Sequence, residues 1–323
     1  MKYVYTTAFV IMRAQPLHAG HIRLIEHAKT LAADVVVLVG SANRPRSIRN
    51  PWTYEERVAM IQAHGVRVAP INDNYYNDAA WLAGVYEVMD KMTDDQVATR
   101  NRVLVGHSKP DTRYLQWYTA IDFEEVEALD EQRSGTQIRE LLLSGEAQDS
   151  PYPPLAPEVL EDYAYFKQEA ALFAGYPYKE TLNFNCGDAV TMCDGNVLLI
   201  QRAKAPGRGT WAFPGGFKNA DETFQDCAIR ELYEETNIDA ARNDLNIIDT
   251  RLFDSPSRGT GNGIPRNTLA VLIEVKRDAD GNLPAIRAAD DAAAARWVPI
   301  AEAINDLPMY DDHLDILLNM LYD

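Results

Sequence analysis

The chain is short of cysteine, of long apolar runs and of positive charge. Its 323 residues include only three cysteines, Cys186, Cys193 and Cys227. This odd and scattered set offers neither a disulfide framework nor the spacing of zinc ligands. No apolar stretch approaches the ~20 residues of a membrane-spanning helix, and the N-terminus lacks a signal-peptide layout. We therefore expect a cytoplasmic protein that makes no membrane contact.

Acidic residues outnumber basic ones, 48 against 31, which gives a net charge of −17. A nucleic-acid-binding surface needs a basic face, so we expect no nucleic acid among the partners. Small phosphorylated ligands are still allowed, because a few local arginines with a metal ion are enough to bind them. The apolar fraction, 46%, is that of an ordinary globular protein, and a chain of this length predicts two domains.

The first half of the chain alternates strands and helices. The continuous apolar run at 35–39 is typical of a parallel strand covered on both faces. The β-α-β order predicts an α/β fold, an open parallel sheet with ligands at the carboxyl ends of its strands. Strands are expected at 4–12, 35–39, 66–71, 103–107 and 121–126, and helices at 20–33, 53–64, 78–92, 134–143 and 157–171. The helix at 53–64 is expected to open with a capping box of Thr53 and Glu56, and Asp78 is expected to cap the helix at 78–92.

The second half is richer in strands and predicts a mixed sheet around one helix. Strands are expected at 182–192, 197–202, 245–253, 268–275 and 297–298, followed by a helix at 314–321. We expect the amphipathic helix at 157–171 to pack on the first sheet. The predicted domains are therefore 1–176 and 177–323.

An acidic pattern between Gly216 and Ile238 carries the sharpest chemical signal. Glu222 follows Gly216 after five residues, and the run RELYEETNI begins after seven more. Its glutamates stand three and four residues apart and share one helix face: Glu231, Glu234 and Glu235. Arg230 lies four residues before Glu234, where its side chain is expected to orient that carboxylate. Such crowding disfavours a bare helix, and a bound cation reverses that cost. Carboxylates with open water positions suit Mg²⁺ or Mn²⁺.

This pattern closely resembles the Nudix box. The resemblance implies a Nudix α/β/α domain in which Glu234 and Glu235 act in catalysis and the metal is held by Gly216, Glu231, Glu234 and Glu235. Asn237 stands where the family usually has Gly. Asn tolerates the left-handed conformation at a helix C-terminus, so we expect the turn to be kept.

Two further motifs point to a second site. His18 and His21 flank Gly20 at a strand-to-helix junction, where a helix N-terminus favours phosphate. This stretch resembles the HxGH motif of the nucleotidylyltransferases. Residues 134–139, SGTQIR, resemble the ISxTxxR element of the same superfamily. Either motif alone could be a packing or capping sequence, and together they predict a triphosphate site.

Within this superfamily, the segments at 40–43, 50–53 and 56–57 look like the archaeal-type nicotinamide-mononucleotide adenylyltransferases. The resemblance implies a Rossmann-like domain that condenses NMN and ATP to NAD and pyrophosphate, with His18, His21 and Arg139 in catalysis. The substrate-binding candidates on this resemblance are Arg13, Gln15, Gly20, Arg46, Trp81, Lys109, Ser134 and Thr136. Two roles stay open for Trp81, a platform for the nicotinamide ring or an aromatic residue of the core. For Arg46 and Lys109 the alternatives are contact with a phosphate or an ordinary place on the surface. Met12 stands where the family often has Gly.

The whole architecture resembles the bifunctional NMN adenylyltransferase/Nudix ADP-ribose pyrophosphatases. The implied second reaction converts ADP-ribose and water to AMP and ribose 5-phosphate. Arg258 and Arg266 are candidates for binding the ribose phosphate or pyrophosphate, against the alternative of an uninvolved glycine-rich loop. The expected partners are ATP, NMN and ADP-ribose, and a homo-oligomer stays open.

Two other functions compete with this hypothesis. One pairs a different transferase acceptor with a Nudix hydrolase of another nucleotide. The other is a non-catalytic Nudix-derived sensor of ADP-ribose. The intact glutamates of the box argue against this second alternative.

Overall fold

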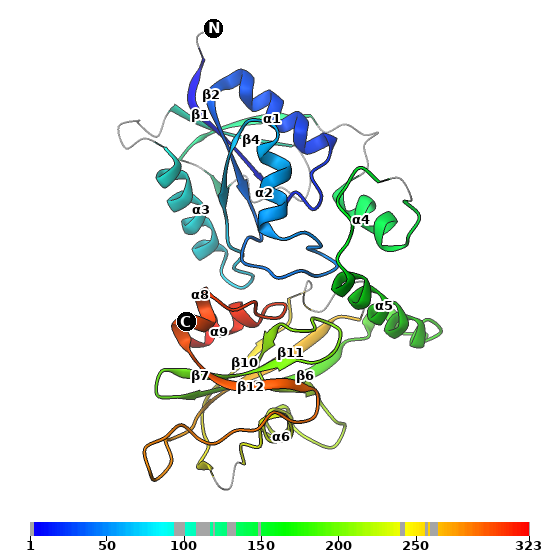
Figure 1. Ribbon diagram of the computed structural model, residues 1–323, viewed down its shortest axis with the longest axis vertical. Coiled ribbons are helices and arrows are strands. Elements are labelled where there is room, and N and C mark those ends of the chain that lie inside the picture. Colours follow the sequence, from blue (N-terminus) through cyan, green and yellow to red (C-terminus); the bar gives the residue numbers. More distant parts are fainter. Residues whose placement is uncertain are drawn as a thin grey trace. The chain divides into compact units, whose positions relative to one another are not determined.

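The computed structural model describes residues 3–93, 101–107, 117–118, 120–127, 134–147, 150–239, 243–255, 258 and 264–322. The chain divides into two compact units, Met1–Ala156 and Pro157–Asp323. Each unit has its own sheet (Figure 1). Within the described ranges, no helix is long and apolar enough to cross a membrane.

The first unit is built on a parallel sheet, as the β-α-β order predicts. Its elements are β1 (Tyr5–Met12), α1 (Ala19–Leu31), β2 (Ala32–Val39), α2 (Tyr54–Gln62), β3 (Arg67–Pro70), α3 (Asp78–Met92), β4 (Arg102–His107), β5 (Asp122–Val126) and α4 (Gly135–Leu143). The strand order is β3-β2-β1-β4-β5, and every pair is parallel. The order reverses between β1 and β4, and in such sheets ligands bind at the carboxyl ends beside the reversal.

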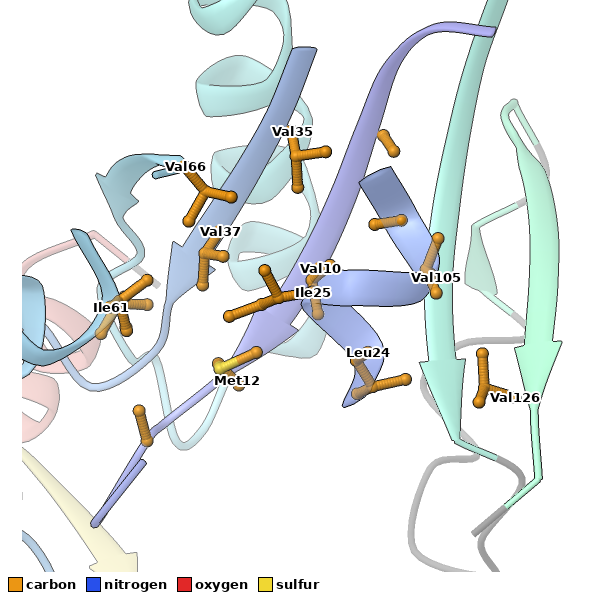
Figure 2. Packing of buried hydrophobic residues seen from close by; sticks show 14 of the residues in the cluster. Val10, Met12, Leu24, Ile25, Val35, Val37, Ile61, Val66, Val105 and Val126 are labelled. Atoms are coloured by element: carbon orange, nitrogen blue, oxygen red, sulfur yellow. The ribbon is translucent and has the colours of Figure 1, made fainter. Parts of the chain in front are cut away.

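Strand β1 is buried on both faces from Thr7 to Val10, which explains the apolar run at 8–12. Val10 packs with Ile25 of α1 and Ile61 of α2 in one core (Figure 2). Its neighbour Phe9 belongs to a second core with Met89 of α3. Successive side chains of a strand point to opposite faces, so the two cores lie on opposite sides of the sheet.

Helix caps in this unit follow the predicted chemistry, with one correction. Thr53 accepts from Glu56 N, and the Glu56 carboxylate accepts from Thr53 N, so the expected capping box opens α2. The cap of α3 is Asn77, whose Oδ1 accepts from Ala80 N, and Asp78 is the first helical residue. The expectation that Asp78 is the cap was therefore wrong.

Helix α1 ends earlier than expected. It stops at Leu31, because Ala32 already pairs with Tyr5 in the sheet. Leu31, Ala32 and Ala33 all favour a helix, so the predicted helix continues into residues that belong to β2.

The second unit is the expected mixed sheet with helices on both sides. Its elements are α5 (Pro157–Leu172), the 3₁₀ turn η3 (Lys179–Thr181), β6 (Phe184–Cys193), β7 (Asn196–Arg202), β8 (Trp211–Ala212), β9 (Gly215–Phe217), α6 (Phe224–Thr236), β10 (Asn246–Phe253), β11 (Arg266–Glu274), β12 (Ala292–Pro299), α8 (Ile300–Asn305) and α9 (His313–Tyr322). The order is β10-β11-β6-β7-β12, with β8 on β7 and β9 on β6. Strands β6 and β11 are parallel, and the other pairs are antiparallel.

Helix α6 covers one face of this sheet through Ala228 and Leu232, which pack with Ala189 and Val271. Figure 1 shows α8 and α9 on the other side of the strands. A Cβ on Gly187 of β6 would lie 2.8 Å from Phe224 O and 3.0 Å from Ala228 N. Glycine at this position therefore lets the helix approach the strand closely.

Helix α5 groups with the second unit, whereas the sequence placed it in the first, before a boundary at 176/177. Its Asp162 carboxylate accepts from Gly207 N, and its Glu169 pairs with Arg266. Both partners belong to the second unit. We therefore propose a boundary before α5.

Candidate active sites

A cavity of about 580 Å³ opens at the carboxyl ends of β1 and β4, the place that the strand order favours. Basic and aromatic side chains line it together with the carboxylates of Asp73 and Asp78. They include Arg13, His21, Arg49, Tyr75, Trp81 and His107. Trp81 also packs on the core beneath the cavity, so both interpretations of this residue have structural support.

The two histidines form one stacked pair at the start of α1. His18 Nδ1 accepts from Gly20 N at 3.2 Å, and His21 Nδ1 accepts from His18 N at 3.4 Å. Their ring centroids are 3.8 Å apart. Because each Nδ1 accepts a hydrogen bond, each neutral ring carries its proton on Nε2. The pair therefore supplies two N–H donors at a helix N-terminus.

The second motif lies directly against the histidine turn. Ser134 caps α4, and Arg139 donates to Gln15 O at 2.5 Å and to Thr136 Oγ1 at 3.0 Å. A Cβ on Gly135 would lie 3.6 Å from the His18 ring. Burial lowers the pKa of Arg139 to about 10, so it stays cationic at neutral pH. The structure thus brings together two motifs that are more than a hundred residues apart.

Other predicted residues of this site have structural partners. Both ends of the Gln15 side-chain amide bond the Trp52 backbone, at 2.8 and 3.1 Å. Arg46 forms a bidentate pair with Glu56, at 2.8 Å for each bond. The cation that lines the cavity from this loop is Arg49, three residues later. The Gly20 carbonyl lies 3.2 Å from His107 Nε2, and Lys109 lies outside the described residues.

Sequence reasoning missed the role of Arg57. Its side chain is 1% exposed and donates to the carbonyls of Arg13, Gly40 and Ser41 at 2.8, 2.6 and 2.9 Å. It thereby ties the end of β1, which carries Arg13, to the end of β2. The helical pattern at 54–62 gave no sign of this role, because the bonded carbonyls belong to distant segments.

A second cavity, of about 540 Å³, lies within the second unit beside α6. All four predicted metal residues line it: Gly216, Glu231, Glu234 and Glu235. A Cβ on Gly216 would meet the Glu231 carboxylate. Glycine is therefore what lets this carboxylate reach the β9 backbone.

Two of the glutamates are buried, and their ionisation responds to that burial. Glu235 accepts from Gly215 N at 3.0 Å, and burial raises its pKa to about 8. Burial also raises the pKa of Glu231. In the described part of the chain, no three ligating side chains already stand together as a metal cluster. A divalent cation would favour the ionised carboxylates, so these hard oxygen donors fit Mg²⁺ or Mn²⁺.

Arg230 binds the acidic groups of the box to one another. It donates to Glu222, Glu231 and Glu234 at 2.8, 2.7 and 2.8 Å. Its hydrogen bond lowers the pKa of Glu222 to about 2. The expected orientation of Glu234 by Arg230 is confirmed by this contact, as is the left-handed turn at Asn237, whose φ is 62°.

The two arginines predicted to bind ADP-ribose line the cavity but are matched by protein carboxylates. Arg258 is buried between Asp188, at 2.9 Å, and Asp312, at 3.1 Å. Arg266 pairs with Glu169 at 2.5 Å and lies over three phenylalanine rings, Phe166, Phe184 and Phe217. Contact with substrate stays a prediction for both.

Another lining residue went unnoticed in the sequence. His313 Nδ1 accepts from Phe213 N at 3.0 Å, and burial lowers the pKa of His313 to about 4. The ring is therefore neutral at physiological pH. A lone histidine at the start of the last helix carries no motif that would have revealed this.

Comparison with known proteins agrees with this division of the chain. Residues 13–140 match the cytidylyltransferase-like family, and residues 187–320 match the NUDIX domain. A nicotinamide/nicotinic acid mononucleotide adenylyltransferase of Acinetobacter baylyi is 31% identical over 159 residues, 47% of this chain and 82% of the relative. A nicotinamide-nucleotide adenylyltransferase of Methanosphaerula palustris is 32% identical over 162 residues, 48% of this chain and 90% of the relative.

One solved structure resembles both units at once. The bifunctional NMN adenylyltransferase/ADP ribose pyrophosphatase from Francisella tularensis is 25% identical, covers 98% of each chain and has a TM-score of 0.82. A second structure of that enzyme, complexed with AMP and a Mn ion, has a TM-score of 0.81. The chain therefore belongs to the nicotinamide-nucleotide adenylyltransferase family, and a Nudix domain follows later in its sequence, as in the bifunctional NMN adenylyltransferase/ADP-ribose pyrophosphatases.

Proposed function

We propose that the first unit condenses NMN and ATP to NAD and pyrophosphate, and that the second hydrolyses ADP-ribose to AMP and ribose 5-phosphate. The observation that carries this proposal is the pairing of the two motif sets with two separate cavities, one in each unit. The similarity to a bifunctional enzyme over 98% of both chains supports it.

In the first reaction the NMN phosphate attacks the ATP α-phosphate in line and pyrophosphate leaves, so no protein nucleophile is needed. Catalysis then consists of positioning and charge stabilisation. The Nε2–H groups of His18 and His21 are the donors proposed for the transferring phosphate. Arg139, held by Gln15 O and Thr136, supplies a fixed positive charge beside them, and Arg13 and Arg49 add charge from the cavity wall.

In the second reaction the carboxylates of Glu231, Glu234 and Glu235 are the proposed ligands of the metal ion at which the pyrophosphate is cleaved. A divalent ion bound there would neutralise the pyrophosphate and lower the pKa of an attacking water. Arg230 fixes Glu231 and Glu234, and Gly215 N fixes Glu235. Mg²⁺ and Mn²⁺ are the proposed ions, and ATP, NMN and ADP-ribose are the proposed small-molecule partners.

A pair of variants tests both halves in one protein. His21→Ala should lower NAD formation by ~10²–10³, the typical cost of a transition-state donor, and leave ADP-ribose hydrolysis near normal. Glu234→Gln should do the reverse, because it removes a proposed metal ligand from the second site. The Glu234 side chain is exposed, so the substitution should cost the fold little. Chelation of divalent ions should abolish hydrolysis, and added Mn²⁺ should restore it.

Two results would contradict the proposal. Unchanged NAD formation in His21→Ala would remove the first assignment. Faster cleavage of dGTP or a dinucleoside polyphosphate than of ADP-ribose would replace the second substrate, and binding of ADP-ribose with no cleavage would indicate a sensor.

A further inference from the structure

Helix α5 lies outside both segments that match known families, 13–140 and 187–320. Nevertheless Tyr165, in the middle of this helix, lines the second cavity. The same helix holds two other parts of the cavity wall, a loop and an arginine.

The loop is residues 203–210, whose first four residues line the cavity. The Asp162 carboxylate, buried on α5, accepts from Gly207 N at 2.9 Å. Glu161 of α5 pairs with Arg208 next to it. Gly207 has a φ of 76°, and a Cβ there would meet the Tyr310 ring. The loop is thus fixed between α5 on one side and Tyr310 on the other.

The arginine is Arg266, at the start of β11. Glu169 of α5 accepts from its Nη2 at 2.5 Å, and the Phe166 ring lies 5.4 Å from the guanidinium carbon. Tyr165 Oη donates to the same Glu169 carboxylate at 3.4 Å. One carboxylate of α5 therefore sets the position of two lining side chains.

We propose that α5 is a wall of the hydrolase site: Tyr165 contacts the nucleotide substrate, and Asp162 and Glu169 are positioning residues that hold loop 203–210 and Arg266 around it. The proposal rests on the proposed hydrolase function. The carboxylates of α6 have separate supports, Gly215 N and Arg230. Loss of the α5 contacts should therefore weaken substrate binding more than the chemical step.

A purely structural role for α5 predicts a different result. Such a role would lower the melting temperature or the fraction of active protein, which changes the apparent kcat and leaves KM unchanged. A positioning role raises KM in protein whose second unit is folded at the assay temperature.

The test uses full-length Asp162→Ala, Glu169→Gln and Tyr165→Ala, with Gln168→Ala as the matched control because Gln168 is exposed on the same helix. KM and kcat are measured with ADP-ribose and Mn²⁺, and circular dichroism melts check that the second unit is folded at the assay temperature. Removing a hydrogen bond to a charged group should raise KM about tenfold, with kcat within about threefold. Asp162→Asn keeps an acceptor oxygen and should restore most of the affinity, and the control should match the wild type.

Wild-type KM in all three variants would overturn the proposal. If Asp162→Ala does not fold, Tyr165→Ala decides, because it removes a lining side chain without unpairing a buried backbone group. If the wild type prefers another nucleotide, the same variants are measured with that nucleotide. A raised KM there would support the role of α5 while the ADP-ribose assignment falls, so the two failures are distinguishable.

Discussion

At the scale of single residues, some buried polar side chains shape a site by holding the backbone around it. Arg57 is the example in the first unit, since its guanidinium donates to carbonyls at the ends of β1 and β2. Lysine keeps the charge but lacks the planar fork of donors. Each hydrogen bond of a charged group is worth roughly 1.5–3 kcal/mol.

We predict that Arg57→Lys lowers both the melting temperature and the kcat/KM of NAD formation, the latter by at least about tenfold. The cause is loss of the fixed position of Arg13. Thermal melts and steady-state kinetics measure the two effects, with Arg67→Lys, an exposed arginine of β3, as control. Wild-type values for Arg57→Lys would show that these carbonyl contacts do not position the site.

Arg258 shows how far a motif-based role can differ from a structural one. Replacing it leaves Asp188 and Asp312 buried without their cation. Breaking a buried ion pair typically costs about 3–5 kcal/mol. We predict that Arg258→Ala lowers the free energy of unfolding of the second unit by this order, measured by urea denaturation. A stable variant with only a raised KM for ADP-ribose would instead favour the substrate role predicted from the sequence.

Asp162 gives a pH dependence whose sign is fixed. Burial raises the pKa of Asp162 from 3.8 to about 6. The hydrogen bond from Gly207 N and the charge of Arg202 oppose this rise, whereas the charges of Glu161 and Glu158 add to it. The folded state binds this proton more tightly than the unfolded state. Its contribution to stability is therefore complete below about pH 4 and is lost as the pH rises through 6.

We predict that Asp162→Asn removes this part of the pH dependence. The wild type should lose stability relative to the variant between pH 4 and pH 7, as measured by urea unfolding at each pH. A constant difference between the two proteins across this range would refute the assignment.

At the scale of elements, two paired glycines have different roles: one is needed for helix packing and the other for the geometry of the proposed metal site. Gly187 of β6 and Gly216 of β9 are register partners. A Cβ on Gly187 meets the α6 backbone, whereas a Cβ on Gly216 meets the end of the Glu231 side chain. Backbone cannot yield cheaply, but a carboxylate can swing away.

The same substitution should therefore have two outcomes. Gly187→Ala should push α6 from the sheet and lower the melting temperature markedly. Gly216→Ala should fold and lose most of its metal-dependent hydrolysis, because Glu231 is displaced. Thermal melts and ADP-ribose turnover measure both effects, and full hydrolysis in folded Gly216→Ala would remove Glu231 from the proposed metal site.

The same scale shows what the sequence could predict. The buried parallel strands and the caps at Thr53 and Ser134 follow from local patterns, and the structure confirms them. Strands β8 and β9 have two and three residues, too few to show a period. Arg49, like Arg57, belongs to a segment whose partners lie far along the chain, so no local pattern marks it. The sequence also leaves the unit of α5 undetermined for a related reason, since its amphipathic face does not say which sheet it covers.

At the scale of the whole molecule, each site is closed within one unit. The described lining residues of the first cavity lie between Ile11 and Trp117, and those of the second between Tyr165 and His313. Neither set crosses the division after Ala156. Two activities on one chain therefore do not require the units to share catalytic groups.

We predict that the fragment of residues 1–156 forms NAD and that the fragment of residues 157–323 hydrolyses ADP-ribose, because each keeps its own sheet and cavity. A fragment of residues 177–323, cut at the boundary suggested by sequence, should hydrolyse ADP-ribose poorly. It lacks Tyr165, and its Gly207 N and Arg266 lose the carboxylates of Asp162 and Glu169. Circular dichroism checks folding and the two assays check function. Equal hydrolysis by the 157–323 and 177–323 fragments would return α5 to the first unit, and NAD formation that needs residues 157–172 would do the same.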